Sequence, residues 1–168
     1  MRNSTVRRLV FLAVCTSVSM VLSYIEFLLP PVFAAVPGIK LGLANVAILF
    51  VLYRYGVWYA AGVSAVRVCL SALLFGNPMT FAYSVAGAAL SLTVMALLKL
   101  TKRFSPVGVS VVGGIMHNLG QIIVAMILLD TVEIGYYMIA LTISGTVSGV
   151  LVGLAGGYLV KRVPMAKK

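Results

Sequence analysis

Long apolar runs limit the fold of this chain more than any other feature. Six can be drawn, at about residues 9–29, 39–53, 57–75, 79–98, 106–129 and 134–160. A helix needs about 20 residues to cross the ~30 Å of hydrocarbon in a bilayer, and five of the runs approach that length. The second run is short, which allows a tilted or partly re-entrant helix. We predict an all-α, polytopic membrane protein, a six-helix transmembrane bundle that forms a single domain over residues 1–168.

The composition points the same way. Of the 168 residues, 62% are hydrophobic and 10% are charged, whereas about a quarter of a soluble domain is charged. No water-soluble fold hides that much apolar surface. The first run follows basic residues, as in a signal peptide, but it is longer than the apolar core of most signal peptides. We therefore expect it to be retained as the first span.

The net charge of +10 comes from 13 basic and 3 acidic residues. In a soluble protein this balance would suggest a nucleic-acid partner. Here the basic residues gather at the ends of the apolar runs, which is typical of membrane topology and leaves no case for nucleic acid. With a cytoplasmic N-terminus, every basic residue except Lys40 and Arg67 falls on the inner side. We predict that both termini are cytoplasmic and that the protein lies in a plasma membrane.

Polar side chains within the apolar runs mark a candidate binding site. Such groups are costly in hydrocarbon and usually face a bundle interior or a cavity. They come from four runs and lie at the middle to outer depth: Glu26, Lys40, Asn45, Arg67, His117, Asn118 and Gln121. His117 and Gln121 are four residues apart and share a helix face. We predict one substrate-binding site that opens toward the outside.

The charged members of this set allow more than one interpretation. Arg67 at mid-depth costs about 2.5–3.5 kcal/mol on insertion scales. It could bind an anion, form a structural ion pair with Glu26, or extend its guanidinium toward the interface. Lys40 and Glu26 could equally be residues of the membrane interface.

The uncharged members are ambiguous in the same way. His117 could contact a ligand or be a core histidine with a satisfied hydrogen bond. A metal site is not supported, because no second histidine or cysteine lies near it in the sequence. Asn118 and Gln121 could orient a ligand or join helices by hydrogen bonds, each worth about 1 kcal/mol.

Catalytic signatures are missing from the sequence. It contains no Walker A, HExxH or GxSxG pattern and no cluster of cysteine and histidine. Its three acidic residues are not adjacent, so they cannot form the carboxylate-held magnesium site that allylic diphosphate chemistry relies on. We expect no enzymatic activity, no cofactor and no metal. Without an ATPase motif, the chain also cannot power transport by itself.

Small residues suggest where helices pack closely. The last run has glycine at 145, 149, 153 and 157, four apart and on one face. Ala13 and Ser17 share the same spacing in the first run. Bare backbone on one face suits close helix–helix contact, either within this chain or with a partner.

Two segments carry a family resemblance. Residues 37–45 (PGIKLGLAN) and 113–121 (GGIMHNLGQ) resemble the signatures of a bacterial family called Gx transporter, or heptaprenyl diphosphate synthase component I. The likeness covers nearly the whole chain. That family is similar to the substrate-binding S components of energy-coupling factor importers, which are six-helix proteins that dock on a transmembrane coupling subunit and two ATPases. The resemblance implies that Ala13 and Ser17 belong to the docking face, although Ser17 departs from the usual alanine.

Two functions follow from these features. The first is an S-component-like subunit of an energy-coupling factor importer, which binds a small anionic nutrient or cofactor precursor. The alternative is a membrane accessory subunit of heptaprenyl diphosphate synthase in isoprenoid or quinone synthesis, with a separate catalytic subunit. A third, weaker hypothesis is a self-sufficient proton-coupled transporter, for which Glu26 is the sole candidate carboxylate.

Overall fold

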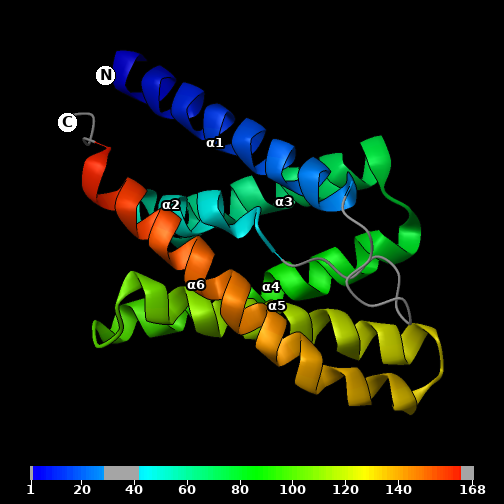
Figure 1. The fold of residues 1–168 in the computed structure, drawn as a ribbon. Coiled ribbons are helices and arrows are strands. Elements are labelled where there is room, and N and C mark those ends of the chain that lie inside the picture. The colour runs from blue at the N-terminus through cyan, green and yellow to red at the C-terminus, as the bar shows by residue number, and fades with distance from the viewer. Residues whose placement is uncertain (1, 29–41, 164–168) are drawn as a thin grey trace.

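The computed structural model describes residues 2–28 and 42–163. Within these residues the protein is helical, and five helices are long and apolar enough to cross a membrane, with a shorter sixth among them. The elements are α1 (Arg2–Leu28), α2 (Asn45–Tyr55), α3 (Val57–Phe75), α4 (Pro78–Thr101), α5 (Pro106–Leu128), the 3-10 helix η1 (Val132–Tyr137) and α6 (Met138–Arg162) (Figure 1). The predicted all-helical class agrees with this architecture, and the helices indicate a multi-pass membrane protein.

Two helix starts follow directly from local sequence. Before α4, the Asn77 side chain accepts from the Thr80 N–H at 2.9 Å, and the Thr80 hydroxyl accepts from the Asn77 N–H at 2.9 Å. This reciprocal pair is a capping box, and Pro78 follows it at the first helical position. Ser105 caps α5 in a simpler way, because its hydroxyl accepts from the Gly108 N–H at 3.2 Å.

Two helices begin later than the runs drawn on the sequence, whereas α1 begins earlier, at Arg2 instead of residue 9. The second run was placed at 39–53, but α2 begins only at Asn45 and residues 43 and 44 form a turn. Gly42 before it has a φ of 86°, a left-handed conformation that ends any helix continuing toward the N-terminus. The sixth run was placed at 134–160, whereas a 3-10 helix precedes α6, which begins at Met138. Hydropathy does not register either change, because both segments are apolar.

The helices form two halves. In the N-terminal half α1, α2 and α3 pack on one another, and in the C-terminal half α5 packs closely against both α4 and α6. The halves meet where α2 contacts α6 and α3 contacts α4 (Figure 1). α2 lies at the centre of the core, with Ile48, Leu49 and Val51 no more than 1% exposed. A helix buried on all sides is apolar all round and does not need the length of a lipid-facing span.

Glycines bring the helices of the C-terminal half into backbone contact. A Cβ atom at Gly114 of α5 would lie 2.5 Å from the Gly145 carbonyl oxygen of α6, and one at Gly149 would lie 2.6 Å from the Cα of Val111. All four predicted glycines thus face α5, and 145, 149 and 153 approach its backbone most closely. Gly157 is less crowded, with Pro106 at 3.6 Å from its Cβ position. Small residues permit this close approach in membrane bundles.

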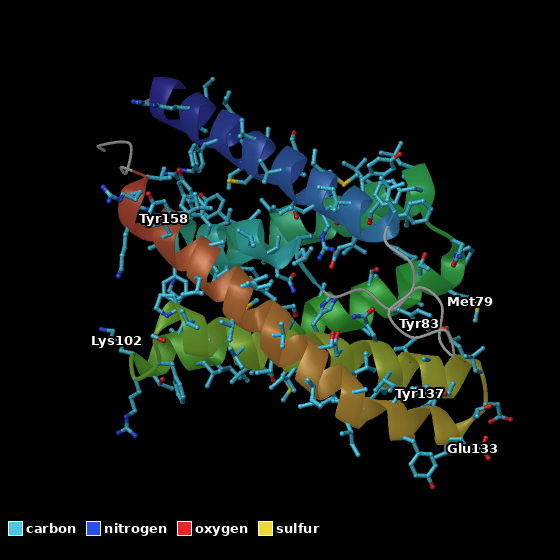
Figure 2. All side chains as sticks on the ribbon, in the orientation of Figure 1. Met79, Tyr83, Lys102, Glu133, Tyr137 and Tyr158 are labelled. Carbon is cyan, nitrogen blue, oxygen red and sulfur yellow. The ribbon has the colours of Figure 1, made fainter. Side chains whose placement is uncertain are left out.

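The two ends of the bundle differ in charge. The start of α1 and the end of α6 lie at the same end of the bundle (Figure 1). Lys102 and Tyr158 lie at that end as well, and Glu133 lies at the opposite one (Figure 2). The cytoplasmic placement of both termini stays a prediction.

Candidate solute-binding site

The site is built around residues 42–45, which we call the entry turn because they lead into α2. The turn closes on itself through a hydrogen bond from the Asn45 N–H to the Gly42 carbonyl, at 2.9 Å. Two side chains of α1 hold it: the Glu26 carboxylate accepts from the Leu43 N–H at 2.8 Å, and the Ser19 hydroxyl donates to the Ala44 carbonyl at 3.2 Å. The start of α2 is thereby fixed to the end of α1.

Arg67 is the most unusual residue of the site. It lies in α3, where its side chain is 2% exposed, and Glu26 is the carboxylate that attracts its charge. Among the described residues, the Nε and Nη2 atoms of Arg67 have no hydrogen-bond partner. A guanidinium stays charged in proteins and offers five N–H donors. Leaving a buried donor unpaired costs about 1–3 kcal/mol, and more for a charged group, so Arg67 has donors to give to an anionic ligand.

His117 lies between two glycines. A Cβ atom at Gly42 would lie 3.4 Å from the ring Cδ2 of His117 and 3.0 Å from the Asn45 Nδ2, so both side chains reach the entry turn. A Cβ atom at Gly87 of α4 would lie 3.0 Å from the ring Cε1. The ring therefore occupies space that any larger residue at Gly87 would take. It is 2% exposed.

Asn118 and Gln121 continue this cluster along α5. The Asn118 Nδ2 donates to the Leu141 carbonyl of α6 at 2.8 Å, and Gln121 Nε2 lies 3.5 Å from the Asn118 Oδ1. The Gln121 Cγ lies 3.0 Å from the same Gly87 position that His117 approaches. Asn118 thus joins α5 to α6, which is one of the two roles that the sequence left open for it.

The predicted site residues in the described part of the chain lie on both sides of the boundary between the halves. Those of the N-terminal half are Glu26, Asn45 and Arg67, and those of the C-terminal half are His117, Asn118 and Gln121. None is more than 9% exposed. Contacts or electrostatic attraction link them in a chain from Arg67 through Glu26 and the entry turn to His117 and Gln121. Lys40 falls outside the described residues.

The residues predicted for partner docking lie elsewhere. Ala13 and Ser17 are exposed on α1, and the Ser17 hydroxyl donates to the Ala13 carbonyl of the same helix at 3.0 Å. That internal bond satisfies the hydroxyl and leaves the face free of unpaired polar groups.

A small cavity adjoins the site. Its lining includes the entry turn and facing parts of α4, α5 and α6: Gly42, Asn45, Met95, Ser110, Gly113, Gly114, Ser148, Gly149 and Val152. Of the predicted site residues, Asn45 lies in its wall. Sequence reasoning missed Ser110 and Ser148. Their signal was weak, because serine is common where membrane helices pack and only its placement beside glycine singles these two out.

A comparison with protein families finds one match. The family model described as "Heptaprenyl diphosphate synthase component I" matches residues 15–159, which include every described site residue. No curated protein and no solved structure matches the chain.

Proposed function

The chain belongs to the heptaprenyl diphosphate synthase component I family, and within that family we propose that it acts as a solute-binding membrane subunit of an energy-coupling factor importer. The ligand is a small anionic nutrient or cofactor precursor. One observation carries the proposal: Arg67 is 98% buried within the bundle, yet two of its guanidinium nitrogens have no partner among the described residues. If Arg67 served only in a structural ion pair, we would expect these two guanidinium nitrogens to have hydrogen-bond partners.

The surrounding residues suit ligand recognition. A carboxylate or phosphate oxygen can accept two parallel N–H bonds from a guanidinium, which is a strong and directional contact. Asn45 is part of the entry turn, and His117 approaches that turn from the other half of the bundle, so both can orient the rest of the solute by hydrogen bonds. We assign Gln121 and Lys40 to the same role, and Glu26 to the balance of charge at Arg67.

The proposed partners follow from what the chain lacks. Its sequence has no nucleotide-binding motif, so transport requires ATPases and a coupling subunit in the membrane. The face of α1 with Ala13 and Ser17 is exposed and small, and large apolar residues such as Val10, Val14 and Val21 lie exposed on the same helix. We propose this helix as the docking element.

A second candidate function rests on the family description. A component I implies a partner synthase subunit, and this chain would then be its membrane accessory. In that case the apolar bundle would hold prenyl chains near a soluble, aspartate-rich catalytic subunit. This function predicts co-purification with that subunit and a change in product chain length when the accessory is removed.

Uptake and binding measurements separate the two. Native mass spectrometry of the purified protein is expected to detect a retained anionic molecule, and uptake of that molecule is expected to require the ATPases. Arg67→Lys keeps the charge but loses the planar guanidinium, so affinity should fall by about tenfold or more. Arg103→Lys, at an exposed position outside the site, is the control. Uptake by this chain alone that survives Arg67→Ala would contradict the proposal, as would a synthase subunit as the sole co-purifying protein.

A further inference from the structure

The cavity between the halves has its own chemistry. Its walls bring together the Asn45 amide, at the start of α2, and the hydroxyls of Ser110 in α5 and Ser148 in α6. Gly113, Gly114 and Gly149 contribute bare backbone. The space has room for about one water molecule. It lies where the α2 side of the bundle meets the α5–α6 pair.

The polar groups of this cavity are poorly satisfied by the protein. Ser110 is 3% exposed and Asn45 is 7% exposed, and neither side chain forms a hydrogen bond with any residue that the structure describes. The Ser148 hydroxyl has one long bond, at 3.3 Å, to the Gly145 carbonyl. A buried polar group without a partner costs about 1–3 kcal/mol. Two such groups and the weakly bonded Ser148 hydroxyl around one small space therefore favour a ligand that both donates and accepts.

We propose that the cavity binds one water molecule, which Asn45, Ser110 and Ser148 hold and which joins the two halves of the bundle. A buried water commonly makes about three hydrogen bonds, and this cavity supplies that number of side chains. No carboxylate among the described residues lines it, so none of them supplies a counter-charge to a bound cation. An empty space of this size is stable where its walls are apolar, and these walls are not.

This water would also hold a side chain of the candidate site in place. The Asn45 amide is 3.0 Å from the Cβ position of Gly42, which His117 approaches from the other half. A water that ties the amide to α5 and α6 fixes its orientation at that boundary. The inference goes beyond the proposed function and holds whichever solute the protein binds.

Radiolytic footprinting tests the proposal in the intact protein. X-ray irradiation converts a bound water to a hydroxyl radical in place, and the radical oxidises the nearest reactive side chain. Met95 lines the cavity, is 2% exposed and carries an oxidisable sulfur. We expect Met95 to be oxidised in the wild-type protein at doses that oxidise Met79, which is 41% exposed. A Met95 that stays unmodified at those doses would overturn the proposal without any variant.

A pair of variants then locates the water. Ser110→Val removes a hydroxyl and fills the cavity, so Met95 oxidation should fall several-fold. Ser71→Val is the matched control, because Ser71 is a buried serine in α3 outside the cavity wall, bonded to the Val68 carbonyl at 3.1 Å. Equal Met95 oxidation in wild type and Ser110→Val would refute the site. Loss of wild-type oxidation when sodium is replaced by a large organic cation would refute water in favour of an ion.

Discussion

The coupling between Glu26 and Arg67 gives the most quantitative test of this site. Arg67 is 98% buried and Glu26 is the carboxylate that acts on its charge. Glu26→Gln keeps an oxygen that can accept from the Leu43 N–H, so the entry turn keeps its hydrogen bond while the charge is lost. Removing one partner of a buried ion pair costs about 3–5 kcal/mol. Glu26 attracts the charge of Arg67 without a hydrogen bond between the two side chains, and two guanidinium nitrogens have no partner among the described residues, so we expect a loss at or below the lower end of this range.

The double variant isolates the interaction. Replacing both residues, as Glu26→Gln with Arg67→Met, leaves no uncompensated charge and is expected to be clearly less destabilising than the sum of the single changes. The free energy of unfolding would be measured in mixed micelles for the wild type, both single variants and the double variant. Glu133→Gln, at an exposed position of η1, is the control and should be neutral.

A coupling energy below about 0.5 kcal/mol is within the range of additive, independent sites. Such a value would refute the reasoning and leave Arg67 without a compensating carboxylate. The same variants report on function. If the solute is anionic, Glu26→Gln should bind it more tightly than the wild type, because the ligand no longer repels a carboxylate beside Arg67.

Two further predictions concern packing in the C-terminal half. Gly114→Ala places a methyl group 2.5 Å from the Gly145 carbonyl oxygen and should destabilise the protein by about 1–3 kcal/mol in a thermal unfolding assay. Gly62→Ala is the control, because nothing lies within 4 Å of its Cβ position, and it should be neutral or stabilise α3 by up to about 1 kcal/mol. Equal losses of stability at Gly62 and Gly114 would contradict the close packing of α5 on α6. Asn118→Ala removes the 2.8 Å bond to the Leu141 carbonyl and should cost about 0.6–1.7 kcal/mol; no loss would show that the α5–α6 contact does not depend on it.

The grouping of these buried polar side chains could be predicted better than their hydrogen-bond partners. His117 and Gln121 lie four residues apart on an apolar run, so their shared helix face followed from periodicity alone. The hydrogen bond from Asn118 to Leu141 did not, because it depends on how closely two glycine faces let α5 and α6 approach. The hydrogen bond of Glu26 with the Leu43 N–H lies equally beyond the sequence. A hydrogen bond from a backbone N–H cannot be predicted from residue types, because every residue except proline carries that donor.

By itself, the sequence determined that this chain is a helical membrane protein and that its interior carries a small number of costly polar groups. Both conclusions follow from the cost of polar groups in hydrocarbon. Each spanning helix must satisfy its own backbone hydrogen bonds, and each charge buried in the bundle is costly enough to require a compensating interaction. Tertiary structure decided which groups meet. It placed α2 at the centre, set Arg67 beside Glu26, and enclosed Ser110 and Ser148 around a polar cavity, because these contacts depend on the angles and distances between helices that hydropathy does not encode.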